Sequence, residues 1–439
     1  MTLHETDYLV IGGGAMSCAF VDALLTGDKT ATVTIIERRA RLGGHWCNAY
    51  PYVTLHQPAL FYGVNSIKLG NGSTDLSTLD EILAYFDKVL DRFIKTGRVT
   101  FLSGHEYLGA NNAAPMNAKD ETIEFRVKKR VVNGTYMGVE IPSTHPPKFE
   151  VADDVPFMPP NNLPEQIGKW DNYYVLGCGK TGIDAVLYLL RNGVSPDKIN
   201  WVMSSDIWCF DRSGLQVGTV MDTIIDQCNS VRRANTPDDI FLQLEGDSGD
   251  IMRLDKDVLP TKWKCATLSP AEMKELRPVK NKIRYGRIKK LNCEGIEFAD
   301  QNLGYPDKTL FINCTADALA SRAPKPVFTE GHIDLQSVFF CQQVFSAAAI
   351  AGLETCKISD KMRNWVRPVP HPERPAEWPH LLSITMDNAL KLHVFMPIWM
   401  LRSRLFYLSH EPFLRYLKYA TKALFISHPL RRAARRLSR

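Results

Sequence analysis

The sequence predicts an α/β fold of two parallel-sheet domains, the second inserted in the first, with a helical, basic C-terminal extension. Glycine-rich segments at residues 12–17 and 177–182 each follow an apolar run and precede a helical pattern. From residue 401 onward, ten basic side chains accompany one acidic side chain, a net charge of +9 in a chain that carries +5 overall. A glycine-rich loop between a strand and a helix is typical of Rossmann-like dinucleotide-binding domains, so we expect two of them.

The first glycine-rich segment joins a predicted strand at residues 7–11 to a predicted helix at residues 18–25. The unpaired N–H groups at such a helix N-terminus bind a pyrophosphate. Gly12 is expected to make the tight turn and Gly14 to let the backbone approach the phosphates, while Ser17 occupies the third fingerprint position. These three residues are therefore predicted to bind a cofactor.

A second apolar run at residues 32–36 ends in Glu37, an acid at the distance where ribose hydroxyls need an acceptor. An acid there favours an unphosphorylated ribose, as in FAD or NAD, and the adjacent Arg38 is a further candidate contact. Gly43 and Gly44 follow, and two glycines there would allow the backbone to lie close to a flavin's phosphates and ribityl chain. The segment therefore favours FAD.

The segment that begins with these glycines resembles the flavin-containing monooxygenases and their Baeyer–Villiger relatives. In those families an acid-ended strand is followed by a GG-x-W motif and then by a Tyr-Pro segment against the flavin. This chain supplies Gly43, Gly44, Trp46, Tyr50 and Pro51. The resemblance implies that the first domain binds FAD and that Trp46 lies near it, whereas plain core packing is the alternative for Trp46 and Tyr50.

The resemblance continues through residues 52–58, where many Baeyer–Villiger enzymes carry an aspartate and the nearest counterpart here is His56. His56 and its neighbour Gln57 are the candidate catalytic residues, because both can form hydrogen bonds near the reactive edge of a flavin. The alternative is that both are loop residues one layer away from the reacting atoms.

The second glycine-rich segment has all three fingerprint glycines, Gly177, Gly179 and Gly182, between an apolar run and a helical pattern that suits packing on a sheet. It resembles the nicotinamide-nucleotide site of the same families, with Lys180 and Thr181 at the variable positions. The resemblance implies that the second domain binds NADPH or NADH and that these five residues contact the nucleotide.

The strand predicted at residues 198–203 ends in Ser204 and Ser205 rather than in an acid, so no carboxylate repels a ribose phosphate. This favours NADPH over NADH. Arg212 lies a few residues further along the chain and could pair with that phosphate in a bidentate manner. The alternative for Arg212 is an ordinary surface arginine.

Some segments depart from the monooxygenase pattern or extend it. No F-x-G-x-x-x-H-x-x-x-W fingerprint precedes the second glycine loop, and the A-T-G-like segment at residues 310–316 ends in Ala316. The run at residues 338–352 reads as a strand leading into a small-residue helix, an element that in this superfamily directs a helix N-terminus toward the flavin. Asn133 and Gly134, which lie between two alternating runs, predict a β-hairpin.

The composition supports one large flavoprotein rather than a string of modules. The 439 residues are 45% hydrophobic and 23% charged and contain no repeat or low-complexity tract. We expect the FAD-binding domain to span residues 1–150 and to resume at residues 305–370, around an NAD(P)-binding domain at residues 155–300. The helical extension is expected at residues 380–439.

The ten cysteines are scattered, without a C-x-x-C pair, and the sequence shows no signal peptide. Reduced and mostly buried thiols in a cytoplasmic protein are therefore expected. Cys47 lies where disulfide reductases carry a redox pair, but no second cysteine follows within the next turn, so dithiol chemistry is not expected. No His, Cys or carboxylate cluster has the spacing of a metal site, so no metal is expected.

Aromatic and aliphatic residues alternate with the basic ones from Val394 to the end of the chain. No stretch reaches the roughly 20 apolar residues that a spanning helix needs. Basic faces with apolar partners suit a helix in the interface of an anionic membrane, so peripheral membrane association is one interpretation. Helices packed on the body with a solvated basic end are the other. Nucleic-acid binding is not expected, because no recognised module accompanies the charge.

Together these features predict an FAD-dependent monooxygenase that uses NAD(P)H to reduce the flavin and O2 to oxygenate a hydrophobic small molecule. Two alternatives stay open. A NAD(P)H dehydrogenase or reductase of a quinone-like acceptor at a membrane surface would use the same cofactors. A non-catalytic binding protein on the flavin fold would account for Ser17 and Ala316, which replace the expected glycines.

Overall fold

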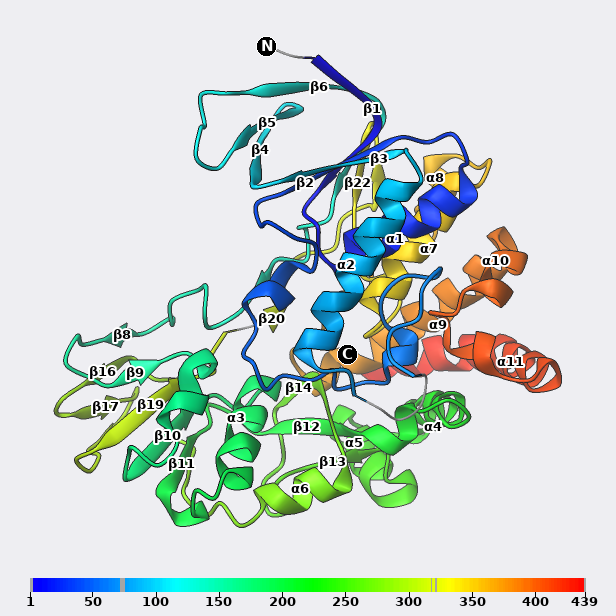
Figure 1. The fold of residues 1–439 in the computed structure, drawn as a ribbon. Coiled ribbons are helices and arrows are strands. Elements are labelled where there is room, and N and C mark those ends of the chain that lie inside the picture. Colours follow the sequence, from blue (N-terminus) through cyan, green and yellow to red (C-terminus); the bar gives the residue numbers. More distant parts are fainter. Residues whose placement is uncertain (1–2, 72–75, 317, 320–321, 438–439) are drawn as a thin grey trace.

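The computed structural model describes residues 3–71, 76–316, 318–319 and 322–437, and its two main sheets lie in separate lobes (Figure 1). The first sheet has the strand order β21-β22-β6-β1-β2-β3, with β5 on β6 and β4 on β5. Its strands are β1 (Leu3–Ile11), β2 (Val33–Glu37), β3 (Val99–Ser103), β4 (His105–Gly109), β5 (Asn112–Pro115), β6 (Ile123–Asn133), β21 (Phe328–Thr329) and β22 (His332–Asp334).

The core of the first sheet is parallel and is covered on both faces. Strands β22, β6, β1, β2 and β3 all run in the same direction. Helices α1 (Ala15–Gly27) and α7 (Gln343–Thr355) pack against each other beside this sheet (Figure 1). Helix α2 (Leu79–Lys95) contacts the edge strand β3. The other face is covered by the β4–β5 hairpin, whose apolar side chains join those of β1 and β6 in one cluster. Burial on both faces explains why β2 is apolar up to its final acid.

The second sheet is entirely parallel, with the order β15-β11-β10-β19-β9. Helices α3 (Lys180–Arg191) and α6 (Pro270–Leu276) belong to the apolar cluster on one of its faces, and a small four-stranded sheet covers the other. The strands of these two sheets are β8 (Glu150–Val151), β9 (Phe157–Met158), β10 (Asn172–Leu176), β11 (Ile199–Val202), β15 (Lys282–Ile283), β16 (Lys290–Asn292), β17 (Gly295–Glu297), β18 (Asn302–Leu303) and β19 (Thr309–Asn313).

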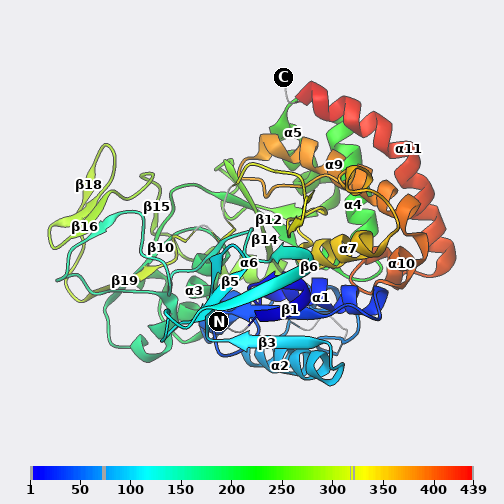
Figure 2. The same cartoon turned by 90° about the horizontal axis from the view of Figure 1, so that it is seen from above.

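A third, three-stranded sheet and the C-terminal helices complete the molecule (Figure 2). Helix α11 packs along α9 and against α4. None of the helices in the described ranges combines the length and apolar character needed to cross a bilayer. These parts are β12 (Ile207–Asp211), β13 (Ile251–Met252), β14 (Lys262–Leu268), α4 (Val220–Arg233), α5 (Pro237–Gln243), α8 (Asp360–Arg363), α9 (Trp378–Phe395), α10 (Pro397–Arg402) and α11 (Phe413–Leu437), with the pair β7 (Val139–Glu140) and β20 (Ala318–Leu319).

The predicted β-hairpin at Asn133 and Gly134 is wrong. Strand β6 contains the first alternating run, continues to Asn133 and ends before the second run; it pairs in parallel with β1 and β22. At its end the Asn133 Oδ1 atom accepts hydrogen bonds from the backbone N–H (3.1 Å) and the hydroxyl (2.8 Å) of Thr135, which turns the chain outward. An Asn-Gly pair also suits such an Asx turn, and the partner of β6 is distant in sequence.

Two further boundaries differ from those expected. Strand β19 still belongs to the second sheet, so the chain rejoins the first sheet at β21 rather than from residue 305. The predicted strand at the start of residues 338–352 is also absent from that segment. Its backbone N–H groups at Val338 and Phe339 both donate to the Ser346 hydroxyl of α7 at 3.0 Å, which takes the place of a strand partner. The strand that leads into α7 is β22, a few residues earlier.

Candidate functional site

The first glycine loop lies at the carboxyl end of β1, between β6 and β2, the position where open parallel sheets bind ligands. Gly12 has a φ of +87°, and a Cβ there would lie 2.7 Å from the Thr135 Cγ2 atom. Gly14 is the N-cap of α1, with extended backbone and with no side-chain cap or first-turn acid in the helix. The positive end of the α1 dipole is therefore left for an anion.

Ser17 replaces the third fingerprint glycine, and a glycine just after the neighbouring strand β6 compensates for it. The third glycine normally allows close packing of the helix on the sheet. Here Ser17 is fully buried, and a Cβ on Gly134 would lie 1.9 Å from its hydroxyl. Gly134, which follows β6, has no side chain and therefore leaves the space that the Ser17 hydroxyl occupies. The serine thus does not push the helix away from the sheet.

Glu37 ends β2 and is 4% exposed. One carboxylate oxygen accepts a hydrogen bond from the Gly13 N–H at 2.6 Å, and the other accepts from the Arg39 N–H at 2.9 Å. This places the carboxylate at the mouth of the loop, where a ribose would compete for its lone pairs. Arg38 instead points outward: its side chain is 62% exposed and reaches Glu106 at 3.9 Å.

The two glycines of the GG-x-W segment touch the first loop directly. The Gly43 N–H donates to the Gly13 carbonyl at 2.9 Å. A Cβ on Gly44, where φ is +61°, would lie 2.9 Å from the Gly14 Cα atom. Beyond them Trp46 is buried, and its indole N–H donates to the Tyr62 hydroxyl at 2.6 Å. Gly44 is therefore required by backbone-to-backbone contact at the N-terminus of α1, and Gly43 by its φ of +128°.

Cys47 follows this segment and is half-buried. Burial raises the pKa of its thiol, and its Sγ atom lies 3.6 Å from the Leu42 carbonyl oxygen. A redox thiol is normally activated by a lowered pKa, so this environment opposes such a role.

The second glycine loop uses its glycines in the roles that the fingerprint assigns. A Cβ on Gly177, where φ is +114°, would lie 2.4 Å from the Cys314 carbonyl oxygen, and one on Gly182 would lie 2.1 Å from the Gly177 carbonyl oxygen. The Trp201 indole N–H donates to that same carbonyl at 2.8 Å. Gly179 is the N-cap of α3, and a Cβ there would meet no atom within 4 Å. The space in front of α3 is therefore open.

One hydrogen bond joins the two loops. The Tyr50 hydroxyl, in the segment that follows Trp46, donates to Asp184 of α3 at 2.7 Å. Asp184 also pairs with Lys180 one turn earlier, whereas Thr181 between them is half-buried. Burial, followed by the negative charge of Asp184, raises the pKa of Tyr50 well above its usual value, so its hydroxyl stays a donor. No local pattern in the sequence indicates this contact, since 134 residues separate Tyr50 from Asp184.

Arg212 has partners other than a nucleotide. Its guanidinium forms a 2.8 Å salt bridge with Glu272 at the start of α6, and its Nε–H donates to the His56 carbonyl at 3.3 Å. The side chain is 12% exposed. It is therefore not an ordinary surface arginine, and it ties the His56 loop to the second lobe. Glu272 has no signal in the sequence that could have revealed this role.

His56 is half-buried, and its Nδ1 atom is buried without a hydrogen-bond partner among the described residues. Burial, then the positive charges of Lys180 and Arg212, lower its pKa to about 3. The imidazole is therefore neutral near pH 7 and carries one free ring nitrogen for a ligand or a water. Gln57 beside it is half-buried. The structure thus brings His56, Lys180 and Arg212 into one neighbourhood.

Gln342, the N-cap of α7, is a second residue with a buried polar atom that has no hydrogen-bond partner among the described residues. It is 2% exposed, its amide nitrogen donates to the Tyr407 hydroxyl at 2.5 Å, and its Oε1 atom has no partner among the described residues. The helix is predicted from the sequence, but this residue is not. Its only signal was its position at the start of a small-residue helix.

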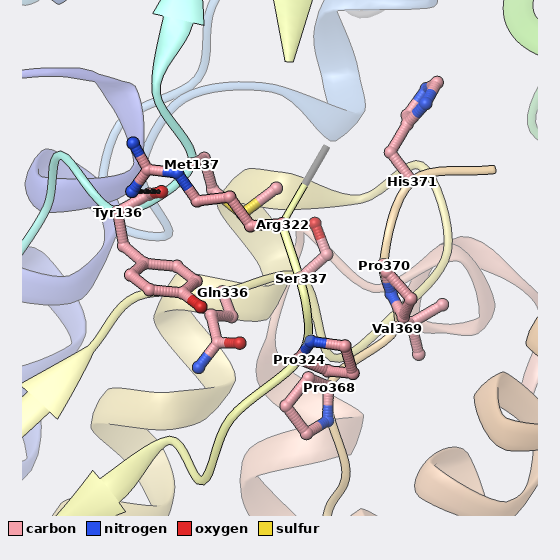
Figure 3. Close-up of a pocket in the computed structure, with 10 residues that line it drawn as sticks. All are labelled: Tyr136, Met137, Arg322, Pro324, Gln336, Ser337, Pro368, Val369, Pro370 and His371. Atoms are coloured by element: carbon pink, nitrogen blue, oxygen red, sulfur yellow. Dashed lines mark hydrogen bonds between the residues drawn. The ribbon is translucent and has the colours of Figure 1, made fainter. Parts of the chain in front are cut away.

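A small pocket of about 40 Å³ opens near the carboxyl ends of β6 and β22 (Figure 3). The Arg322 guanidinium donates to the Tyr136 carbonyl at 2.7 Å on one side of it, and prolines from the segment after α8 line another side. This volume holds a water molecule or a small ion but not a dinucleotide. Across the described residues, no group of three His, Cys, Asp or Glu side chains could hold a metal ion.

Comparison with solved structures finds the same fold. The open crystal structure of cyclohexanone monooxygenase matches with a TM-score of 0.53 and 14% identity, over 89% of this chain and 98% of that one. The OTEMO complex with FAD and NADP matches with a TM-score of 0.52 and 13% identity, over 82% and 84%. At such identities the similarity is one of fold.

Comparison of sequences finds closer relatives. The uncharacterized protein Rv2000 of Mycobacterium tuberculosis is 39% identical over 401 residues, which cover 88% of this chain and 74% of the relative. The uncharacterized protein Mb2023 of Mycobacterium bovis matches to the same extent. No model of a known protein family matches the chain. The chain therefore belongs to the family of these mycobacterial proteins, and its fold is that of the flavin-containing and Baeyer–Villiger monooxygenases.

Proposed function

We propose that this protein is an FAD-dependent monooxygenase that uses NAD(P)H and O2 to oxygenate a hydrophobic small molecule. One observation carries the proposal: two uncapped helix N-termini, at Gly14 and at Gly179, stand at the carboxyl ends of two parallel sheets. The Tyr50–Asp184 hydrogen bond connects the segment after Trp46, in the first lobe, to α3 in the second. Two such sites suit two dinucleotides between which electrons pass.

The first loop fits the pyrophosphate and ribose of FAD. A Cβ on Gly14 would meet only the Gly44 Cα atom, at 3.9 Å, so both backbones can lie against phosphates. Glu37 is placed to accept from ribose hydroxyls. The unpartnered Gln342 Oε1 atom at the N-terminus of α7 fits a ring N–H donor. These residues are the ones that would hold the flavin, with α1 and α7 directing two helix dipoles toward it.

The second loop fits the diphosphate of a nicotinamide nucleotide. The open N-cap at Gly179 gives the phosphates access to the α3 N-terminus, beside Lys180 and Thr181. No acid ends β11, so a 2′-phosphate meets no repulsion there. Arg212 would have to share its salt bridge with Glu272 to bind that phosphate. We therefore keep both NADPH and NADH as donors.

The bound cofactors would supply hydride transfer and the reaction with oxygen, and the protein groups have simpler tasks. Trp46 and Tyr62 form a buried aromatic wall that excludes water beside the first loop. Neutral His56 offers one unpartnered nitrogen, which can hold or accept a proton near the junction of the two lobes. Gln57 is the second candidate hydrogen-bonding group there.

The test uses the purified chain incubated with FAD. We expect a yellow protein whose absorbance near 450 nm, the usual flavin band, is bleached by NADPH without oxygen and recovers when oxygen is admitted. With isotopically labelled O2 and a panel of hydrophobic ketones, sulfides and amines, one labelled oxygen atom should appear in a product. A chain that takes up no flavin would overturn the cofactor assignment and support the binding-protein alternative.

A reductase is the second candidate, because exposed apolar side chains on the C-terminal helices could give access to a lipophilic acceptor. Such an enzyme would reduce a soluble quinone with NAD(P)H at full rate without oxygen. Rapid anaerobic quinone reduction, without label in any product, would replace the monooxygenase proposal by this one.

A further inference from the structure

The C-terminal helices expose apolar side chains where a solvent-facing helix surface is normally polar. Eight of the seventeen exposed large hydrophobic side chains of the described residues lie within residues 394–425, although this segment is a small part of the chain. We call these eight the apolar face. They come from the end of α9, from α10 and from α11: Val394, Ile398, Leu401, Phe413, Leu414, Leu417, Leu424 and Phe425.

Helix α11 carries apolar residues on two opposite sides, one buried against the protein and one exposed. Tyr416, Tyr419 and Ile426 are buried where the helix packs on α9 and α4. Leu414 and Phe425 recur on the opposite side, three turns apart, and are 81% and 77% exposed. Single exposed leucines are normal on soluble proteins, but such a concentration of them on three consecutive helices marks an interaction surface.

The helices that carry the apolar face also carry exposed cations that take part in none of the described salt bridges. The salt bridges found in the described part of this region use Arg415 and Arg431, with Asp222, Glu411 and Asp387 as their acids. Asp222, Glu411 and Asp387 are thereby neutralised, whereas Asp226 of α4 stays exposed in the vicinity of Lys422. Four exposed basic side chains remain on the outside of α10 and α11: Arg402, Lys418, Arg432 and Arg435.

A groove between α4 and α11 adjoins the apolar face and has a volume of about 500 Å³. Ile225, Phe425 and Ile426 give it an apolar lining, and Lys418 and Lys422 stand beside it. An apolar groove next to two ammonium groups matches an acyl chain attached to a phosphate. Its chemistry is that of an anionic phospholipid.

We propose that the apolar face and its cations bind the surface of an anionic lipid bilayer, with α11 lying in the interface. In this orientation Leu414, Leu417 and Phe425 enter the boundary between head groups and acyl chains, while the cations meet lipid phosphates. A second copy of the chain fits less well, because two such faces would bring like charges together. The proposal does not depend on the redox activity.

The experiment measures sedimentation of the full chain with vesicles of phosphatidylcholine and phosphatidylglycerol in equal parts, against vesicles of phosphatidylcholine alone. We expect binding to the mixed vesicles that weakens as salt is raised. The double variant Leu414→Asp/Phe425→Asp should lower the bound-to-free ratio at least about tenfold. Lys418→Glu/Lys422→Glu should lower it too and should flatten its salt dependence.

The matched control is Leu108→Asp, a leucine on β4 that is 49% exposed and lies outside the C-terminal helices. It should bind as the wild type does, and thermal melts should show that all variants fold. Wild-type protein that stays in the supernatant, or apolar variants that bind unchanged, would overturn the proposal. A wild-type dimer in sedimentation velocity that the Leu414→Asp/Phe425→Asp change dissolves, without vesicle binding, would assign the face to a second copy instead.

Discussion

The two glycine loops have the same strand–loop–helix topology but solve the helix-packing problem differently. In the second loop Gly182 packs directly on the Gly177 carbonyl, so the close contact is internal to the fingerprint. In the first loop Ser17 replaces that glycine, and Gly134 after the neighbouring β6 supplies the space. The close helix–sheet contact therefore needs one glycine, and either of the two contacting segments can provide it.

The two loops also differ in what stands before the helix N-terminus. The first is flanked by the GG-x-W segment and by the buried acid Glu37. The second is open at Gly179, and Ser204 and Ser205 rather than an acid stand just after β11. This difference suits the proposed assignment of FAD to the first loop and of a nicotinamide nucleotide to the second.

The largest expected effect, on cofactor binding, comes from placing a bulky side chain at the helix N-cap of each glycine loop. Gly14→Val should raise the dissociation constant for FAD by about 100-fold or more, because two or three charge-assisted hydrogen bonds to phosphate are lost. Gly179→Val should leave a yellow protein that NAD(P)H does not reduce. Neither glycine has a positive φ, so valine fits the backbone. Flavin titration and anaerobic reduction are the measurements.

The control for both is Gly304→Val, an exposed glycine whose Cβ would meet no atom within 4 Å. It should keep both cofactors. Normal reduction of the Gly179 variant would break the comparison, since it would show that the second loop is not the donor site.

Two alanine substitutions, Gly134→Ala and Gly182→Ala, test whether Gly134 takes over the role of the third fingerprint glycine in the first loop. Gly134→Ala should lower the free energy of unfolding by about 1–3 kcal/mol through overpacking against Ser17, and adding Ser17→Gly should restore part of it. The Ile11 carbonyl, 2.9 Å from the new Cβ, prevents full recovery. Gly182→Ala should destabilise at least as much and should not respond to Ser17→Gly. Urea unfolding measures each value, and equal rescue of both alanines would contradict the account.

Acid should destabilise the protein through His56, which lies between the loops. Its folded-state pKa of about 3 is below the usual value of about 6.5, so the unfolded chain binds the proton first. The resulting stability is complete above pH 6.5 and is lost as the pH falls toward 3. Between pH 7.5 and pH 5 the loss should be about 2 kcal/mol.

His56→Gln should remove that part of the pH dependence in urea unfolding at the two pH values. His45, whose pKa burial lowers to about 4, is present in both proteins and cancels in the difference. The exposed His332→Gln variant is the control. An unchanged acid slope in His56→Gln would show that His56 is not held neutral.

The bond between the loops should be worth less. Tyr50→Phe removes the donor to Asp184, which keeps Lys180, so we expect a loss of about 1 kcal/mol in unfolding free energy and a slower flavin reduction. Tyr136→Phe, which removes a 3.1 Å hydrogen bond from an exposed hydroxyl to the Ala323 carbonyl, is the matched control. If both variants are reduced at the wild-type rate, the Tyr50 bond does not couple the loops.

The smallest effect concerns the choice of nucleotide. Glu272→Gln frees the Arg212 guanidinium from its salt bridge, so the ratio of kcat/KM for NADPH to that for NADH should rise by about two- to fivefold. Arg191 also reaches Glu272, at 3.9 Å, and Glu275→Gln, which removes its nearer partner, is the control. A ratio that stays constant in Glu272→Gln would exclude Arg212 as the phosphate partner.

Much of the fold was readable because its signals are local. Apolar runs that end at glycines predicted β1 with α1 and β10 with α3, and the acid at Glu37 was found by spacing alone. The Asn133–Gly134 pair misled for the same reason: its local pattern suits a hairpin, whereas the partners of β6 are β1 and β22, far away in the chain. The return to the first sheet was placed too early because β19 has no local mark of the sheet that it joins.

By itself the sequence determined the two strand–loop–helix units, the serines in place of an acid at the end of β11 and the basic C-terminal segment, because each depends on neighbouring residues. Only the tertiary structure decided that Gly134 compensates Ser17, that Tyr50 meets Asp184, and that Arg212 is held by Glu272. It also decided that half of α11 turns leucine and phenylalanine outward. Such contacts join residues tens to hundreds of positions apart, and their free energy exists only once the lobes have packed.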